Sequence, residues 1–272
     1  MHGFPLTTTA AWIAATVTIV CGAILATWRC TQVPARARVF YDVTLLLMSL
    51  AVVAHLGVAL NLGNYTYAPH ETTYVPRNIE WALTSPLFLL MLAEIVGRLV
   101  GRRLRFIDMA MAILSVGSIL VWLFAIFTLE SNPGVGHLLF LVACLGIAGV
   151  GWYVYDLART IRTCVTISLT ARTHVFQILA VWALLWLSYP GVYELYLLGI
   201  VGHDVRVFLY IVLDVMERGL CNIALLHPAL LTELLVAERR APTSEPERMS
   251  LCHSLARSLP DHPVTATGIT HP

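Results

Sequence analysis

Seven long runs of apolar residues constrain the fold of this 272-residue chain more than any other feature. Each run is long enough for an α-helix to cross the hydrocarbon core of a bilayer, which takes about 20 residues. The composition agrees, because 58% of the residues are hydrophobic and only 12% are charged. The sequence therefore predicts an all-α membrane protein, with a seven-helix transmembrane bundle in residues 1–232. The runs lie at about residues 9–28, 39–60, 76–97, 106–127, 136–157, 175–198 and 206–228.

The remaining residues, 233–272, are rich in proline, serine, threonine and charge, which predicts a disordered tail. Arginines gather in this tail and in the connections after the first, third and fifth runs, whereas the connections after the second and fourth runs have none. Loops rich in arginine usually stay on the cytoplasmic side of a membrane. We therefore expect the N-terminus outside, the C-terminus in the cytoplasm, and a multi-pass protein of the plasma membrane.

Several classes of function leave no sign in the sequence. Membrane topology explains the arginine-rich loops, so they do not indicate a nucleic-acid partner. No two of the six cysteines have the spacing of metal ligands, and neither a phosphate loop nor a nucleophile motif is present. We expect no metal site and no enzymatic activity.

Charged and polar side chains interrupt the run at 76–97. Arg77 and Glu80 are three residues apart, and Glu80 and Thr84 are four apart, which places all three on one helix face. A charge in the middle of a spanning helix costs roughly 2.5–3.5 kcal/mol on insertion scales, so it normally faces the bundle interior and finds a partner there. We expect this face to point inward.

The last apolar run carries a second charged face. Asp214 and Arg218 share it, being four residues apart, whereas Glu217 is expected to point about 100° away from Arg218 and need not share their pocket. Together with Arg77 and Glu80, they form a set of two bases and two acids whose charges sum to zero. Such a set fits two interpretations, a structural ion network or a path for protons or ions.

Three motifs in these runs resemble the microbial (type 1) rhodopsins, the family that includes bacteriorhodopsin. They are RNIEWALTSP at residues 77–86, WLSYPGVY at residues 186–193 and LDVMERG at residues 213–219. The motifs occur in the family's order on the third, sixth and seventh runs. The resemblance covers residues 9 to 230, approximately, and implies the same seven-helix fold.

The resemblance also implies a role for each matching residue. Arg77 matches an arginine on the extracellular side, Glu80 matches the counterion of the retinal Schiff base, and Asp214 matches a second counterion. Arg218 falls where the family has the lysine that binds retinal. The retinal pocket corresponds to Trp81, Thr84, Ser85, Pro86, Phe88, Trp186, Tyr189, Pro190 and Tyr193.

The chain departs from the family at the positions that carry its chemistry. Only a primary amine condenses with the aldehyde of retinal, and a guanidinium group keeps its proton and is a poor nucleophile. All seventeen basic residues are arginines, so no lysine can replace Arg218 and no covalent retinal cofactor is expected. Met91 stands at the position of the proton donor of pumps, and Arg206 stands at the position of their proton-release glutamate. Phe88 stands where pumps usually have a smaller aliphatic residue, so we expect a narrower retinal pocket.

Three functions remain open at this point. The favoured one is an oligomerising or regulatory partner of authentic rhodopsins, working as a homo- or hetero-oligomer, such as a trimer, in the lipid bilayer. The second is a non-covalent binder of retinal or another apolar ligand, with Arg218 as the polar anchor. The third is a light-independent conduit for protons or ions through Arg77, Glu80 and Asp214.

Overall fold

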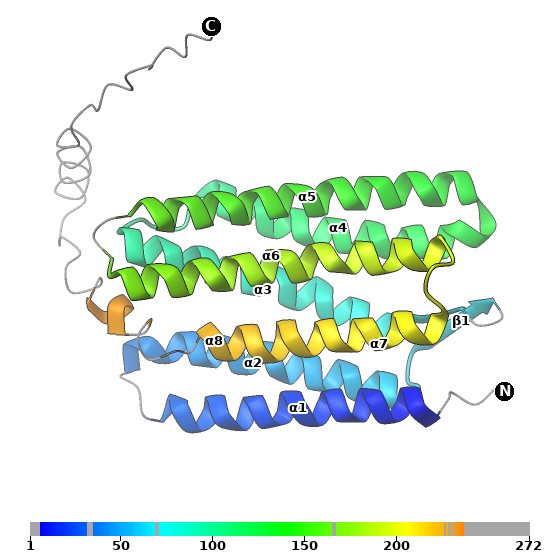
Figure 1. The fold of residues 1–272 in the computed structure, drawn as a ribbon, viewed down its shortest axis with the longest axis horizontal. Helices are drawn as coiled ribbons and strands as arrows, with labels where there is room; N and C mark the ends of the chain where they lie inside the picture. Colours follow the sequence, from blue (N-terminus) through cyan, green and yellow to red (C-terminus); the bar gives the residue numbers. More distant parts are fainter. Residues whose placement is uncertain are drawn as a thin grey trace, which may run out of the picture.

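The computed structural model is a bundle of long helices that lie side by side (Figure 1). It describes residues 6–31, 35–68, 71–164, 167–225, 227, 230 and 232–236. Within these ranges, six helices are long and apolar enough to cross a membrane, which confirms six of the predicted runs. They are α1 (Leu6–Cys30), α2 (Ala35–Ala59), α3 (Val75–Val100), α4 (Phe106–Ser131), α5 (Pro133–Thr163) and α6 (Leu169–Leu197).

The seventh run forms a helical rod made of three segments. α7 (His203–Asp214) is followed by a π-helix, η1 (Val215–Cys221), and by a last short turn, α8 (Asn222–Leu225). The backbone keeps right-handed helical angles at both junctions, with φ near −63° at Val215 and −64° at Asn222. The rod therefore continues through the π-helix, and only its hydrogen-bond spacing changes.

A two-stranded antiparallel hairpin, which the sequence analysis did not predict, connects α2 to α3. Its strands are β1 (Asn64–Ala68) and β2 (Glu71–Tyr74), and the second strand leads directly into α3. We call the end of the bundle that carries the strands the hairpin end (Figure 1). The connections from α3 to α4 and from α5 to α6 lie at the opposite end, called the arginine end.

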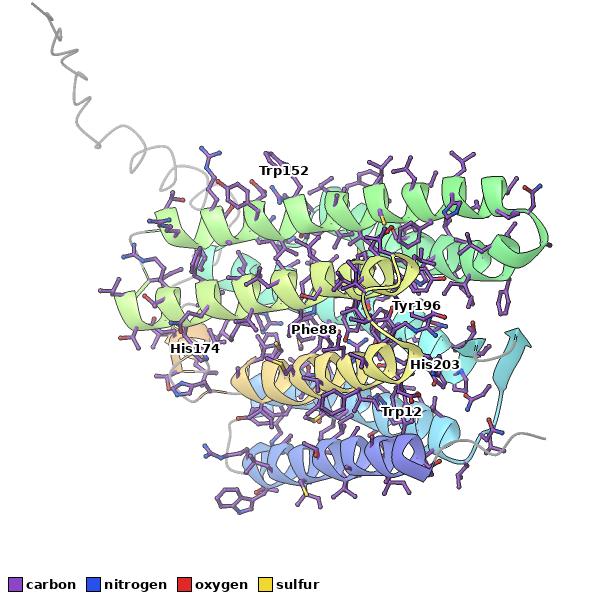
Figure 2. The ribbon with its side chains drawn as sticks, turned by 45° about the vertical axis from the view of Figure 1, so that its right-hand side comes forward. Trp12, Phe88, Trp152, His174, Tyr196 and His203 are labelled. Atoms are coloured by element: carbon purple, nitrogen blue, oxygen red, sulfur yellow. The ribbon has the colours of Figure 1, made fainter. Side chains whose placement is uncertain are left out.

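The helices close into a ring in which each packs against the next along the chain, and the seventh returns to α1. Helix α3 is the most enclosed of the six long helices, with 61% of its most apolar stretch buried against 28–44% in the others. Figure 2 shows Phe88 of α3 inside the bundle and Trp152 of α5 projecting outward. Polar side chains on α3 are therefore placed at the centre of the molecule.

Small residues let α4 and α5 approach each other closely. A Cβ atom on Gly136 would lie 2.7 Å from the Cα atom of Leu129, and one on Gly146 would overlap the hydroxyl of Ser118. Glycine at these contacts is typical of helix pairs in membranes, where close backbone packing replaces the hydrophobic effect. These two helices form a tight pair beside the central α3.

The ordered part of the chain extends beyond the predicted boundary at residue 232. Residues 232–236 are helical, and Leu234 is buried in the main hydrophobic cluster. Helical structure thus continues four residues into the segment predicted as a tail, where Leu234 and Leu235 contact apolar partners. The rest of the predicted tail lies outside the described residues.

Candidate functional site in the bundle core

Helix α3 presents a buried polar face to the middle of the bundle. Arg77, Glu80 and Thr84 follow one another at intervals of about one helical turn, and all three side chains are buried. The hydroxyl of Thr84 donates a hydrogen bond of 2.8 Å to Oε1 of Glu80. The structure thus has the inward polar face that the sequence predicts.

The π-helix η1 adds two charged side chains to the same core. Glu217 and Arg218 are each 1% exposed, and Nη1 of Arg218 donates a 3.0 Å hydrogen bond to Oε1 of Glu217. The sequence analysis left open whether Glu217 shares the pocket of Asp214 and Arg218, and the structure places it there. The expected angle between Glu217 and Arg218 assumed α-helical spacing, whereas the wider π-helical turn brings successive side chains closer in direction.

Two ion clusters cross-link α3 to the seventh helix. Arg77 binds Asp214 through two bonds, with Nε 2.6 Å from Oδ2 and Nη2 3.1 Å from Oδ1. Arg218 lies between two carboxylates, with Nε 3.0 Å from Oε1 of Glu80 and Nη1 bonded to Glu217. Each arginine thus pairs with a carboxylate from the other helix.

Neutral side chains join the two clusters and surround them. The hydroxyl of Tyr189 lies 2.8 Å from Oδ1 of Asp214 and 3.1 Å from Oε2 of Glu217, so it bridges the clusters. Trp182 donates its indole N–H to Glu217 over 3.2 Å. His55, which is fully buried on α2, places Nε2 3.5 Å from Asp214.

Glu217 changes the charge balance of the core. Three carboxylates now face two guanidinium groups, instead of the two pairs that the sequence indicated. Burying an uncompensated charge is costly, so the hydrogen bonds that Tyr189 and Trp182 form with these carboxylates help to stabilise the excess negative charge.

Aromatic rings pack around the ion clusters. Phe88, Trp182 and Trp186 stack in a column, with ring centroids 5.5 Å and 5.1 Å apart. The rings of Trp81 and Tyr189 meet edge to face at 3.9 Å. The column places Phe88 and Trp182 in the interior of the bundle, and sequence reasoning singled out only Phe88. The spacing of Trp182 and Trp186 by one helical turn was the available signal.

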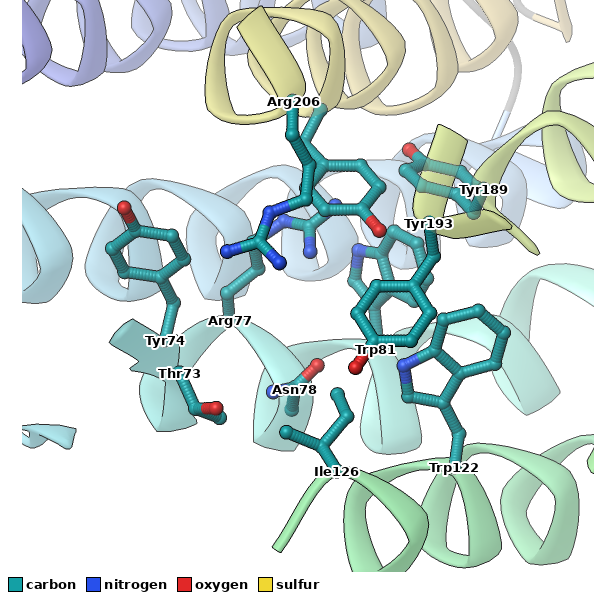
Figure 3. A pocket seen from close by; sticks show the side chains of 11 residues that line it. Thr73, Tyr74, Arg77, Asn78, Trp81, Trp122, Ile126, Tyr189, Tyr193 and Arg206 are labelled. Carbon is teal, nitrogen blue, oxygen red and sulfur yellow. The ribbon is translucent and has the colours of Figure 1, made fainter. Parts of the chain in front are cut away.

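Two adjoining cavities lie between these rings and the hairpin end. The outer cavity encloses about 510 Å³, including its open mouth, and Figure 3 shows its lining. The inner cavity is smaller, about 350 Å³, and this figure also includes open space beyond the enclosed part. The outer lining is Thr73, Tyr74, Arg77, Asn78, Trp81, Trp122, Ile126, Tyr189, Tyr193, Arg206 and Tyr210, and the inner lining is Asn78, Trp81, Ile119, Trp122, Ile147, Trp186, Tyr189 and Pro190.

The structure brings together only some of the residues assigned to a retinal pocket. Trp81, Trp186, Tyr189, Pro190 and Tyr193 line one or both cavities, whereas Thr84, Ser85, Pro86 and Phe88 border neither of them. Arg218 borders neither cavity as well. The polar centre and the cavities are thus adjacent but separate.

The two remaining sequence candidates lie at opposite ends of the core. Met91 is buried on the arginine side of the ion clusters, with its sulfur 4.0 Å from Oγ1 of Thr44. Arg206 is 4% exposed at the hairpin end, with its Cζ atom 3.8 Å from the ring centre of Tyr196. Nearby, burial raises the pKa of Tyr74 to about 12, so this phenol stays neutral at the cavity mouth.

Comparison with known proteins identifies the fold and the family. The family model described as "Bacteriorhodopsin-like protein" matches residues 5–223, which is most of the chain. The chain belongs to this family. No curated protein matches the rhodopsin-like chain by sequence.

Solved microbial rhodopsins share its fold. The thermophilic rhodopsin from Rubrobacter xylanophilus is 24% identical, with a TM-score of 0.71 over 84% of this chain and 98% of that one. A cyanorhodopsin from Tolypothrix sp. NIES-4075 is 19% identical, with a TM-score of 0.73 over 86% and 99%. The light-driven proton pump from Leptosphaeria maculans is 23% identical, with a TM-score of 0.68 over 87% and 98%. The chain is thus a multi-pass membrane protein of the rhodopsin fold.

The residues of this rhodopsin-like core do not fit a covalently bound retinal. The sequence has no lysine, and the guanidinium group of Arg218 already pairs with Glu80 and Glu217. A guanidinium group neither loses its proton nor forms the bond that an amine forms with an aldehyde. No chemical step that depends on bound retinal can therefore be assigned to these residues.

Proposed function

We propose that this rhodopsin-like protein acts by assembly in the membrane, with itself or with retinal-binding rhodopsins, and is not a light-driven pump on its own. One observation carries the proposal, the pairing of Arg218 with Glu80 and Glu217 at the centre of the bundle. A proton pump needs a group there that gains and loses a proton, and arginine stays protonated at all physiological pH values. A role in assembly needs no such group.

The arginine distribution supports an orientation for this assembly. We propose that the hairpin end faces outward and the arginine end faces the cytoplasm, because basic connections are retained on the cytoplasmic side. The plasma membrane is the proposed location. Partners would then meet the bundle through its lipid-facing side chains, of which Trp152 is 72% exposed.

Measuring the oligomeric state in lipid nanodiscs and co-purifying a retinal-binding rhodopsin from the same source test this function. We expect a defined oligomer, or a stable complex that survives dilution and contains both chains. A lysine-bearing rhodopsin from an unrelated source serves as the control for non-specific aggregation. A protein that stays monomeric and captures no rhodopsin would rule out the proposed role.

A conduit for protons or ions has weaker support. Toward the arginine end, Met91, Leu92 and Ile95 of α3 belong to the apolar core. A conduit would need water to cross this apolar layer. Proton flux into vesicles that is lost in the Glu80→Gln variant would nevertheless favour it over assembly.

A further inference from the structure

A short basic loop joins α3 to α4 at the arginine end of the bundle. It reads GRRLR at residues 101–105, and α4 begins immediately afterwards at Phe106. Phe106 is 88% exposed and Leu104 is 43% exposed. Phe106 is also the first residue of the apolar stretch of α4 that is long enough to cross a membrane. The loop therefore combines arginines with exposed apolar side chains at the level where a membrane span starts.

Hydrogen bonds at both ends of the loop fix its backbone. Gly101 ends α3 with a left-handed backbone, at a φ of 73°. The N–H group of Arg102 then donates to the carbonyl of Gly97 over 2.8 Å, which is the longer of the two bonds in a Schellman motif. At the other end of the loop, the N–H group of Arg105 donates to Oδ2 of Asp108 over 2.5 Å. The loop therefore holds its arginines in a defined arrangement.

Aspartates compensate two of the three arginines in the loop. Nη1 of Arg102 lies 3.4 Å from Oδ2 of Asp108, and Nη2 of Arg105 lies 3.4 Å from Oδ1 of the same carboxylate. Nη2 of Arg105 is also 4.0 Å from Oδ2 of Asp156 on α5. Arg103 is exposed and has no carboxylate partner among the residues that the structure describes. Its charge is therefore available to a ligand outside the protein.

Helix α5 supplies a second exposed arginine beside the loop. The contact between Arg105 and Asp156 shows that α5 lies against the loop at this level. Arg159 is exposed and lies about one helical turn farther along α5, toward the arginine end. In the described part of the chain, it also has no carboxylate partner. We call Arg103, Arg159 and Phe106 the basic corner.

We propose that the basic corner binds the headgroup of an anionic phospholipid. The phosphate lies between the guanidinium groups of Arg103 and Arg159, and an acyl chain packs on the ring of Phe106. Arginine binds phosphate oxygens through strong directional hydrogen bonds, and arginines near a membrane surface attract anionic lipids. Membrane topology explains why arginines gather at this end, but it does not explain the fixed loop or the exposed ring beside them. The inference does not depend on the proposed assembly.

Native mass spectrometry of the full chain in nonionic detergent tests this site. The delipidated protein is titrated with phosphatidylglycerol, or with phosphatidylcholine of the same acyl chains, and the bound lipids are counted. We expect one phosphatidylglycerol molecule to bind per chain, more tightly than phosphatidylcholine. Arg103→Gln and Arg159→Gln should each weaken this binding roughly fivefold, since the attraction between one arginine and the phosphate is lost.

A matched control removes an arginine at the same end of the bundle but far from the basic corner. Arg29 lies in the last turn of α1, which is on the opposite side of the bundle from α5 (Figure 1). Arg29→Gln should leave the binding of phosphatidylglycerol unchanged. An equal loss in Arg29→Gln and Arg103→Gln would show a diffuse attraction to a basic surface and overturn the proposal.

The apolar part of the site has its own variant. Phe106→Ser keeps both arginines and should also weaken the binding, because the acyl chain loses its contact with the ring. Wild-type affinity in both Phe106→Ser and Arg103→Gln would contradict the proposed site, and so would equal affinity for phosphatidylcholine. Displacement of phosphatidylglycerol by an equal concentration of glycerol phosphate would assign the site to a soluble phosphate instead of a lipid.

Discussion

Arg218 occupies a position in which a buried cation is stabilised only by its partners. Its side chain is 1% exposed, so water cannot hydrate the guanidinium group. The carboxylates of Glu80 and Glu217 take the place of that water. Such a pair adds little to the free energy of unfolding compared with apolar residues of the same size, but breaking it is costly. The identity of residue 218 therefore has consequences for stability as well as for cofactor chemistry.

Replacing Arg218 with glutamine should destabilise the bundle by about 3–5 kcal/mol, because two buried carboxylates lose their cation. Unfolding in mixed micelles, followed by circular dichroism, measures the difference. Arg218→Lys, which keeps the positive charge, should remain closer to the wild type.

A matched control uses an arginine pair that is partly exposed. Arg98 and Glu94 form an ion pair one turn apart on α3, with 34% and 31% of their side chains exposed. Arg98→Gln should change stability by about 1 kcal/mol or less. If Arg218→Gln is as mild as Arg98→Gln at every pH, the buried pairing described here is incorrect.

The hydroxyl of Tyr189 should contribute to stability through its contacts with Asp214 and Glu217. Tyr189→Phe removes the hydroxyl and keeps the ring, so we expect a loss of about 1.5–3 kcal/mol, the usual value for a hydrogen bond to a charged group. Tyr155→Phe, on the lipid-facing side of α5, is the control and should be neutral. Equal midpoints of thermal unfolding for the two variants would contradict the bridging role.

At the level of single residues, the sequence predicted the polar face of α3 and the charges it meets on the seventh helix, but not which arginine pairs with which carboxylate. The spacing of Arg77, Glu80 and Thr84 was sufficient to predict a shared face, because helical periodicity alone puts the three side chains on one side of the helix. Pairing across helices depends on the height and rotation of the neighbouring helix, which a single sequence does not contain. The position of Glu217 stayed open for the same reason, since its direction follows from the π-helix.

Among the elements, the pair α4 and α5 depends on glycine at its closest contact. A methyl group on Gly136 would meet the backbone of Leu129, which cannot move without separating the two helices. We expect Gly136→Ala to lower the free energy of unfolding by roughly 1–3 kcal/mol. Gly117→Ala on α4 should be neutral or slightly stabilising, because no described residue of another helix lies within 4 Å of the added carbon.

Among the elements, hydropathy identifies the spanning helices but neither the hairpin nor the π-helix. Runs of apolar residues gave six helices directly, since a spanning segment must satisfy its own backbone hydrogen bonds. The hairpin before α3 was missed because its strands lie outside those runs, although tyrosine and threonine in residues 64–74 favour strands. The sequence analysis missed the π-helix because it differs from an α-helix only in which carbonyl each backbone N–H group bonds. Hydropathy carries no information about that spacing.

For the whole molecule, the absence of lysine predicts that no retinal becomes covalently attached. After expression with all-trans retinal and reduction with borohydride, the intact mass should equal that of the unmodified chain. The light-driven proton pump from Leptosphaeria maculans, treated in parallel, is the positive control for labelling. A mass increase of one retinal would show attachment through a group that the structure does not identify.

The stacked rings of Trp182 and Trp186 give the protein an optical signal of its own. Their centroids are 5.1 Å apart and their planes are inclined by 27°, a geometry in which the two indole transitions couple strongly. Near-ultraviolet circular dichroism should therefore contain an exciton couplet from this pair, and it disappears when specific packing is lost. Core integrity can then be followed spectroscopically without the need for a visible chromophore.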